Sequence, residues 1–202
     1  MTHAIIEEAE FEDALGADEA LASVTSFAEG EKSFVAALQE HRDYIESGGE
    51  AGARLTVSGR RFKDQDFASV DLSEATFEDC SFVDCVFRGT SMDQTAFDGS
   101  EFERCDFTAV RSLGISMRRT RLVECGFGGA EFDAAEVEGG GVLKPSFEGT
   151  TFLRCSFGVG RGAATIRQPE LRNVTADAAS VAALKEVGIP TPILRRFTIT
   201  AG

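Results

Sequence analysis

Large apolar residues recur at every fifth position through the middle of the chain. The row runs from Val57 to Phe157, and 20 of its 21 positions are apolar, with Ser112 as the exception. Thirteen of the 17 phenylalanines of the protein lie in this row. The phase holds for 100 residues and fails at Gly162. A repeat this long predicts a stacked, solenoid-like architecture rather than separate helices and strands.

A second row lies two positions before the first and contains mostly small or β-branched residues. All five cysteines of the protein fall in it. A period of five fits neither an α-helix, at 3.6 residues per turn, nor a strand, at two. It fits a chain that turns a corner every five residues and points one large and one small side chain inward on each side. The residues between these positions are mainly Asp, Glu, Arg, Ser, Gly and Gln and are expected to face solvent.

The run from Asp71 to Phe87 resembles the pentapeptide-repeat proteins, and the resemblance covers about residues 55–160. It implies an all-β solenoid core, a right-handed quadrilateral β-helix in which four repeats make one coil. Residues 20 apart then stack, and about five coils are expected. One uninterrupted core stack is predicted, consisting of Phe67, Phe87, Phe107, Phe127 and Phe147.

Other positions of the repeat carry further predictions. Val137 and Val142 lie in the large-residue row and are expected to point inward. Ser112 breaks that row, so we expect a distorted corner or a local change of phase over residues 111–117, with Leu113 replacing Ser112 as the inward residue.

Both ends of a stacked solenoid need caps. Residues 1–52 are predicted to form an acidic helical cap or docking domain, 53–162 the β-helix, and 163–202 a C-terminal cap helix and tail. A helix is expected over 31–45 and a weaker one over 18–28, while residues 1–12 fit an arm, a helix or a strand. Asp177 is expected to begin a short helix that Gly188 ends, and residues 193–199 a strand or extended tail.

Charge is unevenly distributed along the chain. The 34 acidic and 20 basic residues give a net charge of −14, which disfavours direct binding to nucleic acid or an anionic membrane. Residues 1–52 contain 13 acids and 2 bases, whereas residues 161–202 contain 3 acids and 6 bases. Most of the negative charge therefore lies outside the predicted β-helix.

The sequence offers little for catalysis. It has no nucleophile elbow, no His-Glu-x-x-His and no phosphate loop. Its two histidines, His3 and His41, lie outside the repeats. We therefore expect no enzyme activity, no metal and no cofactor, with the cysteines acting as small, reduced core residues. No apolar segment is long enough to span a membrane or to act as a signal peptide, so a soluble, cytoplasmic protein is expected.

The resemblance implies a protein partner. Members of the quinolone-resistance type resemble B-DNA in shape and charge and occupy the DNA site of gyrase, a type II topoisomerase. By this analogy the chain modulates gyrase or protects it from inhibitors. The acidic binding face would consist of Asp71, Glu74, Glu78, Asp79, Asp93, Asp98, Glu131 and Asp133.

Residues 178–189 are similar to the dimerising helix of those proteins. A possible homodimer contact therefore consists of Leu184, Val187, Ile189, Ile193 and Leu194. The alternative function is a scaffold or adaptor whose acidic N-terminal domain docks a partner, such as a component of a secretion or toxin-delivery system.

Overall fold

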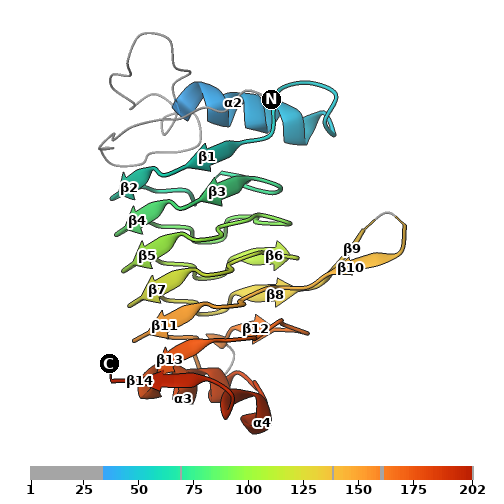
Figure 1. Cartoon of the computed structure of the whole chain (residues 1–202). Helices are drawn as coiled ribbons and strands as arrows, with labels where there is room; N and C mark the ends of the chain where they lie inside the picture. Colours follow the sequence, from blue (N-terminus) through green and yellow to red (C-terminus); the bar gives the residue numbers. More distant parts are fainter. Residues whose placement is uncertain (1–33, 69, 138, 160–161, 202) are drawn as a thin grey trace.

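The fold is a rod of stacked coils with a helix across each end (Figure 1). A computed structural model describes residues 34–68, 70–137, 139–159 and 162–201. The predicted helix over 18–28 and the segment 1–12 lie outside the described residues. Helix α2 (Phe34–Glu46) covers the N-terminal end, and helices α3 (Ala178–Glu186) and α4 (Thr191–Leu194) cover the C-terminal end.

Short parallel strands form the sides of the rod. A seven-stranded sheet has the order β14-β13-β11-β7-β5-β4-β2, a three-stranded sheet has the order β12-β8-β6, and β1 pairs with β3. Isolated bridges such as Asp66↔Val86 and Val86↔Asp106 make the fourth side. The strands are β1 (Thr56–Ser58), β2 (Arg61–Lys63), β3 (Thr76–Glu78), β4 (Ser81–Val83), β5 (Glu101–Glu103), β6 (Arg111–Leu113), β7 (Arg121–Val123), β8 (Glu131–Asp133), β9 (Ala135–Val137), β10 (Gly141–Leu143), β11 (Thr151–Leu153), β12 (Thr165–Ile166), β13 (Thr175–Asp177) and β14 (Thr198–Thr200).

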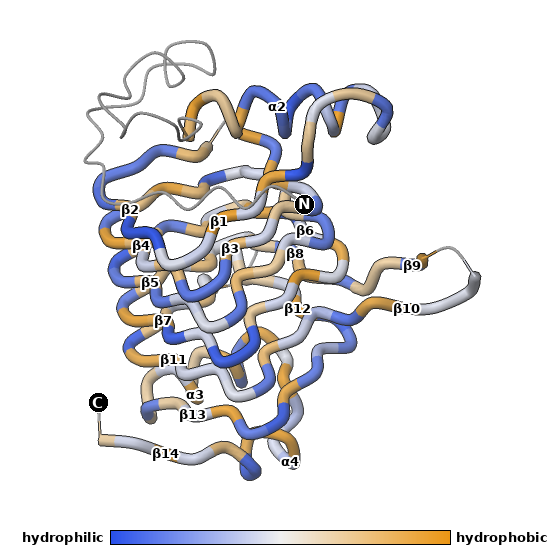
Figure 2. Tube along the Cα trace, turned by 45° about the horizontal axis from the view of Figure 1, so that its top comes forward, coloured by the Kyte–Doolittle hydropathy of each residue, from blue (hydrophilic) through white to orange (hydrophobic). Residues whose placement is uncertain are grey.

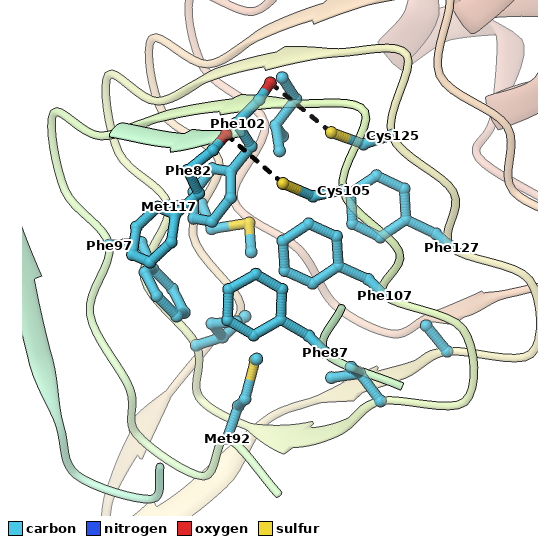
Figure 3. Close-up of a cluster of buried hydrophobic side chains, with 14 of the residues drawn as sticks. Phe82, Phe87, Met92, Phe97, Phe102, Cys105, Phe107, Met117, Cys125 and Phe127 are labelled. Atoms are coloured by element: carbon cyan, nitrogen blue, oxygen red, sulfur yellow. Dashed lines mark hydrogen bonds between the residues drawn. The ribbon is translucent and has the colours of Figure 1, made fainter. Parts of the chain in front are cut away.

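The two sequence rows have separate structural roles. Large residues fill the centre of the rod, where Phe87 stacks on Phe67 with ring centroids 4.8 Å apart. Small residues lie beside them and donate hydrogen bonds to main-chain carbonyls of the preceding coil. Thr90 Oγ1 donates to the Phe67 carbonyl at 2.8 Å, and Cys105 Sγ donates to that of Phe82 at 3.5 Å (Figure 3). The row therefore accepts small or β-branched side chains, and its Thr, Ser and Cys members satisfy their donors with these bonds.

The structure confirms the β-solenoid and corrects the number of its coils. About seven turns are present instead of about five, as the seven-stranded sheet indicates. The parallel ladder continues past residue 162 through β12, β13 and β14, although the repeat has ended there. Ile166 pairs with Phe132, and Ala176 pairs with Phe152, so these later strands extend the same core.

A hairpin interrupts the coils. Strands β9 and β10 pair antiparallel and project from the rod (Figure 1). The prediction that Val137 and Val142 point inward is wrong, because both lie in this hairpin, and Val142 is 53% exposed. The five phenylalanines of the predicted stack are all buried, but Phe147 does not continue it, because Phe157 stacks on Phe127.

The expected distortion at Ser112 is also wrong. Strand β6 keeps the regular register, with Ser112 opposite Phe132, while Leu113 is 45% exposed. The Ser112 hydroxyl donates to the carbonyl of Met92, so its polar group is satisfied inside the rod. The backbone ladder fixes which residue faces inward, even where that residue is small and polar.

Both predicted end helices are present. Helix α2 places Phe34 over Phe62, with ring centroids 5.1 Å apart. Asp177 begins α3, and its carboxylate accepts from the Ser180 amide at 2.8 Å. After Gly188, at φ +90°, the chain forms α4 and then β14. The strand that was one alternative for residues 193–199 is therefore present, but it begins only after α4.

Candidate protein-interaction site

The most distinctive surface of the rod lies where the hairpin leaves it. We call residues 134–143 the arm and the adjoining hollow on the β6–β8–β12 side the groove. The groove has a volume of about 420 Å³. Its lining residues are Ser91, Asp93, Arg111, Ser112, Leu113, Glu131, Phe132, Asp133, Thr165 and Arg167.

The base of the arm packs tightly against the corner after β6. At Gly114, φ is +76°, a conformation that residues with a Cβ atom seldom adopt. A Cβ atom at this position would lie 3.0 Å from the Cβ of Leu143 and 3.3 Å from that of Ala135. The corner itself accepts other residues, since Gln94 has φ +55° at the same place in the coil before. The missing side chain of Gly114 therefore serves the close approach of the arm, which fixes the arm beside the groove.

Exposed apolar side chains gather at this place. The described residues include five exposed large hydrophobic side chains, and three of them lie on β6 or the arm. Leu113 is 45% exposed, Val142 53% and Leu143 43%. Figure 2 shows hydrophobic stretches on β9 and β10, away from the body of the rod. Val142 and Leu143 are consecutive in β10 and point to opposite faces of the arm, so each face carries an exposed apolar side chain. Exposed apolar surface on a projecting hairpin is typical of a protein-binding element.

The groove beside these apolar side chains carries charges of both signs. Arg167 contacts Asp133 at 2.8 Å, and Arg111 lies 3.8 Å from Glu131. The hydrogen bond from Arg167 is the main cause that lowers the pKa of Asp133. Asp93 Oδ1 accepts from the backbone amide of Leu113 at 2.8 Å. The groove is thus a polar rim beside exposed apolar side chains, an arrangement found at protein interfaces.

The eight acids predicted as a binding face lie on two sides of the rod. Asp93, Glu131 and Asp133 meet at the groove, and Asp71 and Glu74 belong to the coil before it. The other three, Glu78, Asp79 and Asp98, lie on the β1–β3 side.

Arginines contact half of these acids. The pairs are Arg54–Glu74, Arg118–Asp98, Arg111–Glu131 and Arg167–Asp133. Within the described residues, no ion pair involves Asp71, Glu78, Asp79 or Asp93. The predicted face therefore presents less negative charge than the sequence alone indicates.

Asp98 stabilises the rod. Its side chain is 10% exposed and accepts from Ser116 Oγ at 2.6 Å and from Arg118 Nε at 2.7 Å. Burial raises the pKa of Asp98, but the hydrogen bonds from Ser116 and Arg118 outweigh burial and leave the pKa below its usual value. A carboxylate held in this way is a structural group and is not available to a partner.

The predicted dimer contact requires correction. Leu184, Ile189 and Leu194 are between 1% and 5% exposed, and they belong to the core of the chain itself. Val187 and Ile193 are half-buried against the same core. These five residues close the C-terminal end of the solenoid, because α3 and α4 cover the last coils there. They do not form an exposed face.

The described residues were also searched for metal ligands, reactive thiols and membrane-spanning helices. No group of three or more His, Cys, Asp or Glu side chains within them is arranged to hold a metal ion. All five cysteines are buried and unpaired, and burial raises the pKa of the Cys80 thiol to about 11. None of the described helices is both long and apolar enough to cross a membrane.

The arm and the groove are the features that sequence reasoning missed. The local signal was the run Gly139-Gly140-Gly141, which is typical of a turn between two strands. The five-residue phase concealed this signal, because the ten residues of the arm equal two repeats and the phase of the large apolar residues does not change after them.

Comparisons with known proteins agree with this architecture. The family description "Pentapeptide repeat region" matches residues 60–132. A search of curated proteins finds no significant match.

Among solved structures, full-length QnrB1, a plasmid-mediated fluoroquinolone resistance protein, is 19% identical with a TM-score of 0.38. The alignment covers 60% of this chain and 64% of QnrB1, so this chain spans less than two thirds of that protein. HetL from the cyanobacterium Nostoc, a pentapeptide repeat protein involved in the regulation of heterocyst differentiation, is 12% identical with a TM-score of 0.19. That alignment covers 67% of this chain and 87% of HetL. The family match and the stacked coils that contain it show that residues 60–132 of this chain are a pentapeptide-repeat region.

Proposed function

We propose that this chain is a non-enzymatic protein-binding rod that contacts its partner through the arm and the groove. The observation that carries the proposal is the exposure of Val142 and Leu143 on the projecting arm, and of Leu113 in the charged hollow at its base. Isolated exposed hydrophobic residues are ordinary, but a projecting hairpin with an exposed apolar side chain on each face adds apolar surface that a partner would cover. A protein surface would cover the apolar residues and leave the charged rim to select the partner.

The partner class follows from the remaining acids. Asp71, Glu78, Asp79 and Asp93 have no ion pair within the described residues and face outward on two adjacent sides of the rod. A surface that binds DNA is basic and would attract them. We propose a type II topoisomerase such as gyrase, with the rod competing for its DNA site and modulating it or protecting it from inhibitors, as the family resemblance implies.

The test is a supercoiling assay with purified gyrase, with and without a quinolone, in the presence of the full chain. An effect of the chain at micromolar concentration is expected. The triple variant Leu113→Ser, Val142→Ser and Leu143→Ser should weaken it at least tenfold. The matched control is Val123→Ser, a half-buried position on the seven-stranded side. No effect of the wild-type chain, or an equal loss in the control variant, contradicts the proposal.

A second function is favoured by the charge distribution. The segment 1–52 carries 13 acids and 2 bases, an imbalance found in no other part of the chain. We propose as the alternative that this segment docks a basic partner, such as a secretion or toxin-delivery component, with the rod as a spacer.

A variant that lacks residues 1–33 distinguishes the two proposed functions. This variant keeps α2, which covers Phe62 at the end of the rod. If it keeps the effect on gyrase, the arm-and-groove function is supported. If affinity capture from the native host recovers a partner with the full chain and loses it with this variant, the adaptor function is supported.

A further inference from the structure

His41 ties the N-terminal helix to the first coil. The ring belongs to α2 and is 1% exposed. Its Nδ1 accepts a hydrogen bond from the backbone amide of Leu55 at 3.1 Å. A backbone amide only donates, so Nδ1 must carry no proton, and the ring must be neutral with its proton on Nε2. This contact is therefore incompatible with an imidazolium.

The surroundings of the ring oppose its charging. Burial is the largest influence and lowers the pKa of His41 below its usual value, and the charge of Arg54 lowers it further. The carboxylates of Asp71 and Glu74 act in the opposite direction and raise it. The ring of Tyr44 is parallel to that of His41, with centroids 6.3 Å apart. The backbone of Ser73 also faces the ring and raises the pKa of His41, but less than burial lowers it.

The helix that carries His41 covers apolar rings at the end of the rod. Phe34 contacts Phe62 at 5.1 Å and Phe67 at 6.4 Å between ring centroids. Near the C-terminal end of the helix, Tyr44 Oη donates to Glu74 at 3.1 Å and accepts from Arg54 at 2.9 Å. Detachment of α2 would therefore uncover the first rings of the core and break the contacts of Tyr44 at the same time.

We propose that α2 is an acid-released cap, in which protonation of His41 breaks its hydrogen bond with the Leu55 amide and detaches the helix from the end of the solenoid. The exposed rings of Phe62 and Phe67 then form a new apolar surface at mildly acidic pH.

The direction of the pH effect on docking follows from the linkage between proton binding and docking. A histidine whose pKa is lower in the docked state binds a proton more readily when α2 is detached, so docking weakens as the pH falls below about 6.5. For one proton, the docking equilibrium constant falls up to about tenfold per pH unit, until the pKa of the docked state is reached.

The fluorescence of Tyr44 can report the detachment of α2. Tyr44 lies on α2 and is the single tyrosine of a chain that has no tryptophan. We would titrate Tyr44 fluorescence of the full chain from pH 8 to pH 5, together with far-ultraviolet circular dichroism. A transition with a midpoint below pH 6.5 and a loss of helical signal are expected, while the β signal persists. A flat Tyr44 signal overturns the proposal.

Three variants assign the proton. His41→Gln retains a side-chain acceptor but does not titrate, and it should abolish the transition. The matched control His3→Gln changes the other histidine and should keep it, as should Glu74→Gln. A transition that survives in His41→Gln, or disappears in His3→Gln, overturns the proposal.

If His41→Gln does not fold, hydrogen exchange of the wild-type chain decides. The Leu55 amide should lose protection between pH 7.5 and pH 5.5, after correction for intrinsic exchange, and the Phe102 amide in the middle of the rod should not. Equal changes at the two amides overturn the proposal.

Discussion

The ring of Phe127 stacks on that of Phe157, with centroids 5.1 Å apart and planes inclined by 11°. Thirty residues separate these two, whereas Phe107 and Phe127 stack with a separation of twenty. The ten additional residues form the arm, which leaves the coil after Asp133 and returns before Pro145. The arm is therefore an insertion into a solenoid that is otherwise continuous.

We expect deletion of residues 134–143 to leave the rod folded. Lys144 would then follow Asp133 and occupy the corner position that Gly114 has in the coil before. Arg104 and Arg119 adopt the same left-handed corner, at φ 53° and 54°. The expected cost of placing a lysine there is about 1–2 kcal/mol. Urea unfolding measures it, and a chain that no longer unfolds cooperatively would show that the arm is part of the solenoid.

The repeat predicted the type of coil correctly, but it gave too few coils and could not reveal the arm. An insertion of ten residues is twice the five-residue period, so Val137 and Val142 stay in phase although they leave the core. Only the stacking of successive coils distinguishes twenty residues from thirty, and that is a tertiary property. Beyond residue 162 the sequence predicts only an out-of-phase half coil with Ile166 and Leu171. The further coil was missed for the opposite reason, since Ala176 joins the ladder without the repeat.

The sequence predicted which acidic residues face outward at the candidate site, but not which of them form ion pairs with arginines. That Asp93 and Glu131 lie outside the core follows from the repeat. Two of the arginines that contact the acids, Arg54 and Arg167, come from segments outside the repeat row, so their position could not be derived from it. The negative face was overestimated for this reason.

The thiols of the native protein are expected to resist labelling. All five cysteines are buried and therefore out of reach of a reagent, and burial raises the pKa of the Cys80 thiol, which suppresses its reactive thiolate. Titration with a chromogenic disulfide at pH 8 should detect fewer than one thiol per folded chain and five in urea. Rapid reaction of the folded chain would contradict the packing of the small-residue row.

Replacement of Asp98 should weaken the rod more than replacement of an exposed acid. Asp98→Asn removes the ion pair with Arg118, which has an N–O distance of 2.5 Å, and is expected to cost about 1–3 kcal/mol in the free energy of unfolding. The control Glu78→Gln lies on the same side of the rod and should stay within about 0.5 kcal/mol. Urea unfolding at pH 7 compares them.

The pH dependence of the same pair provides a second measurement. The pKa of Asp98 is lower in the folded state, so its contribution is complete above the unfolded value of about 3.9. It is lost as the pH falls through the depressed folded pKa. The stability difference between wild type and Asp98→Asn should therefore shrink below about pH 4, and a constant difference would contradict the role of the carboxylate.

Leu184 is expected to stabilise the C-terminal cap and not a dimer. The side chain is 1% exposed within the chain, and Leu184→Ala should cost about 2–5 kcal/mol in unfolding free energy. The control Lys185→Ala changes the exposed neighbour and should have little effect. Light scattering should give both variants the mass of the wild type. A reduced mass for Leu184→Ala without loss of stability would restore the original dimer prediction.

We retain the homodimer as a proposal and move its contact to β14. This strand lies at the edge of the seven-stranded sheet and pairs only with β13 within the described residues, and Ile199 at its centre is 57% exposed. An apolar edge strand without charged residues favours pairing with another copy. Light scattering should therefore give the mass of a dimer, and Ile199→Lys should reduce it to that of a monomer, because two lysines would meet at a two-fold contact. A monomeric wild-type chain contradicts the proposal.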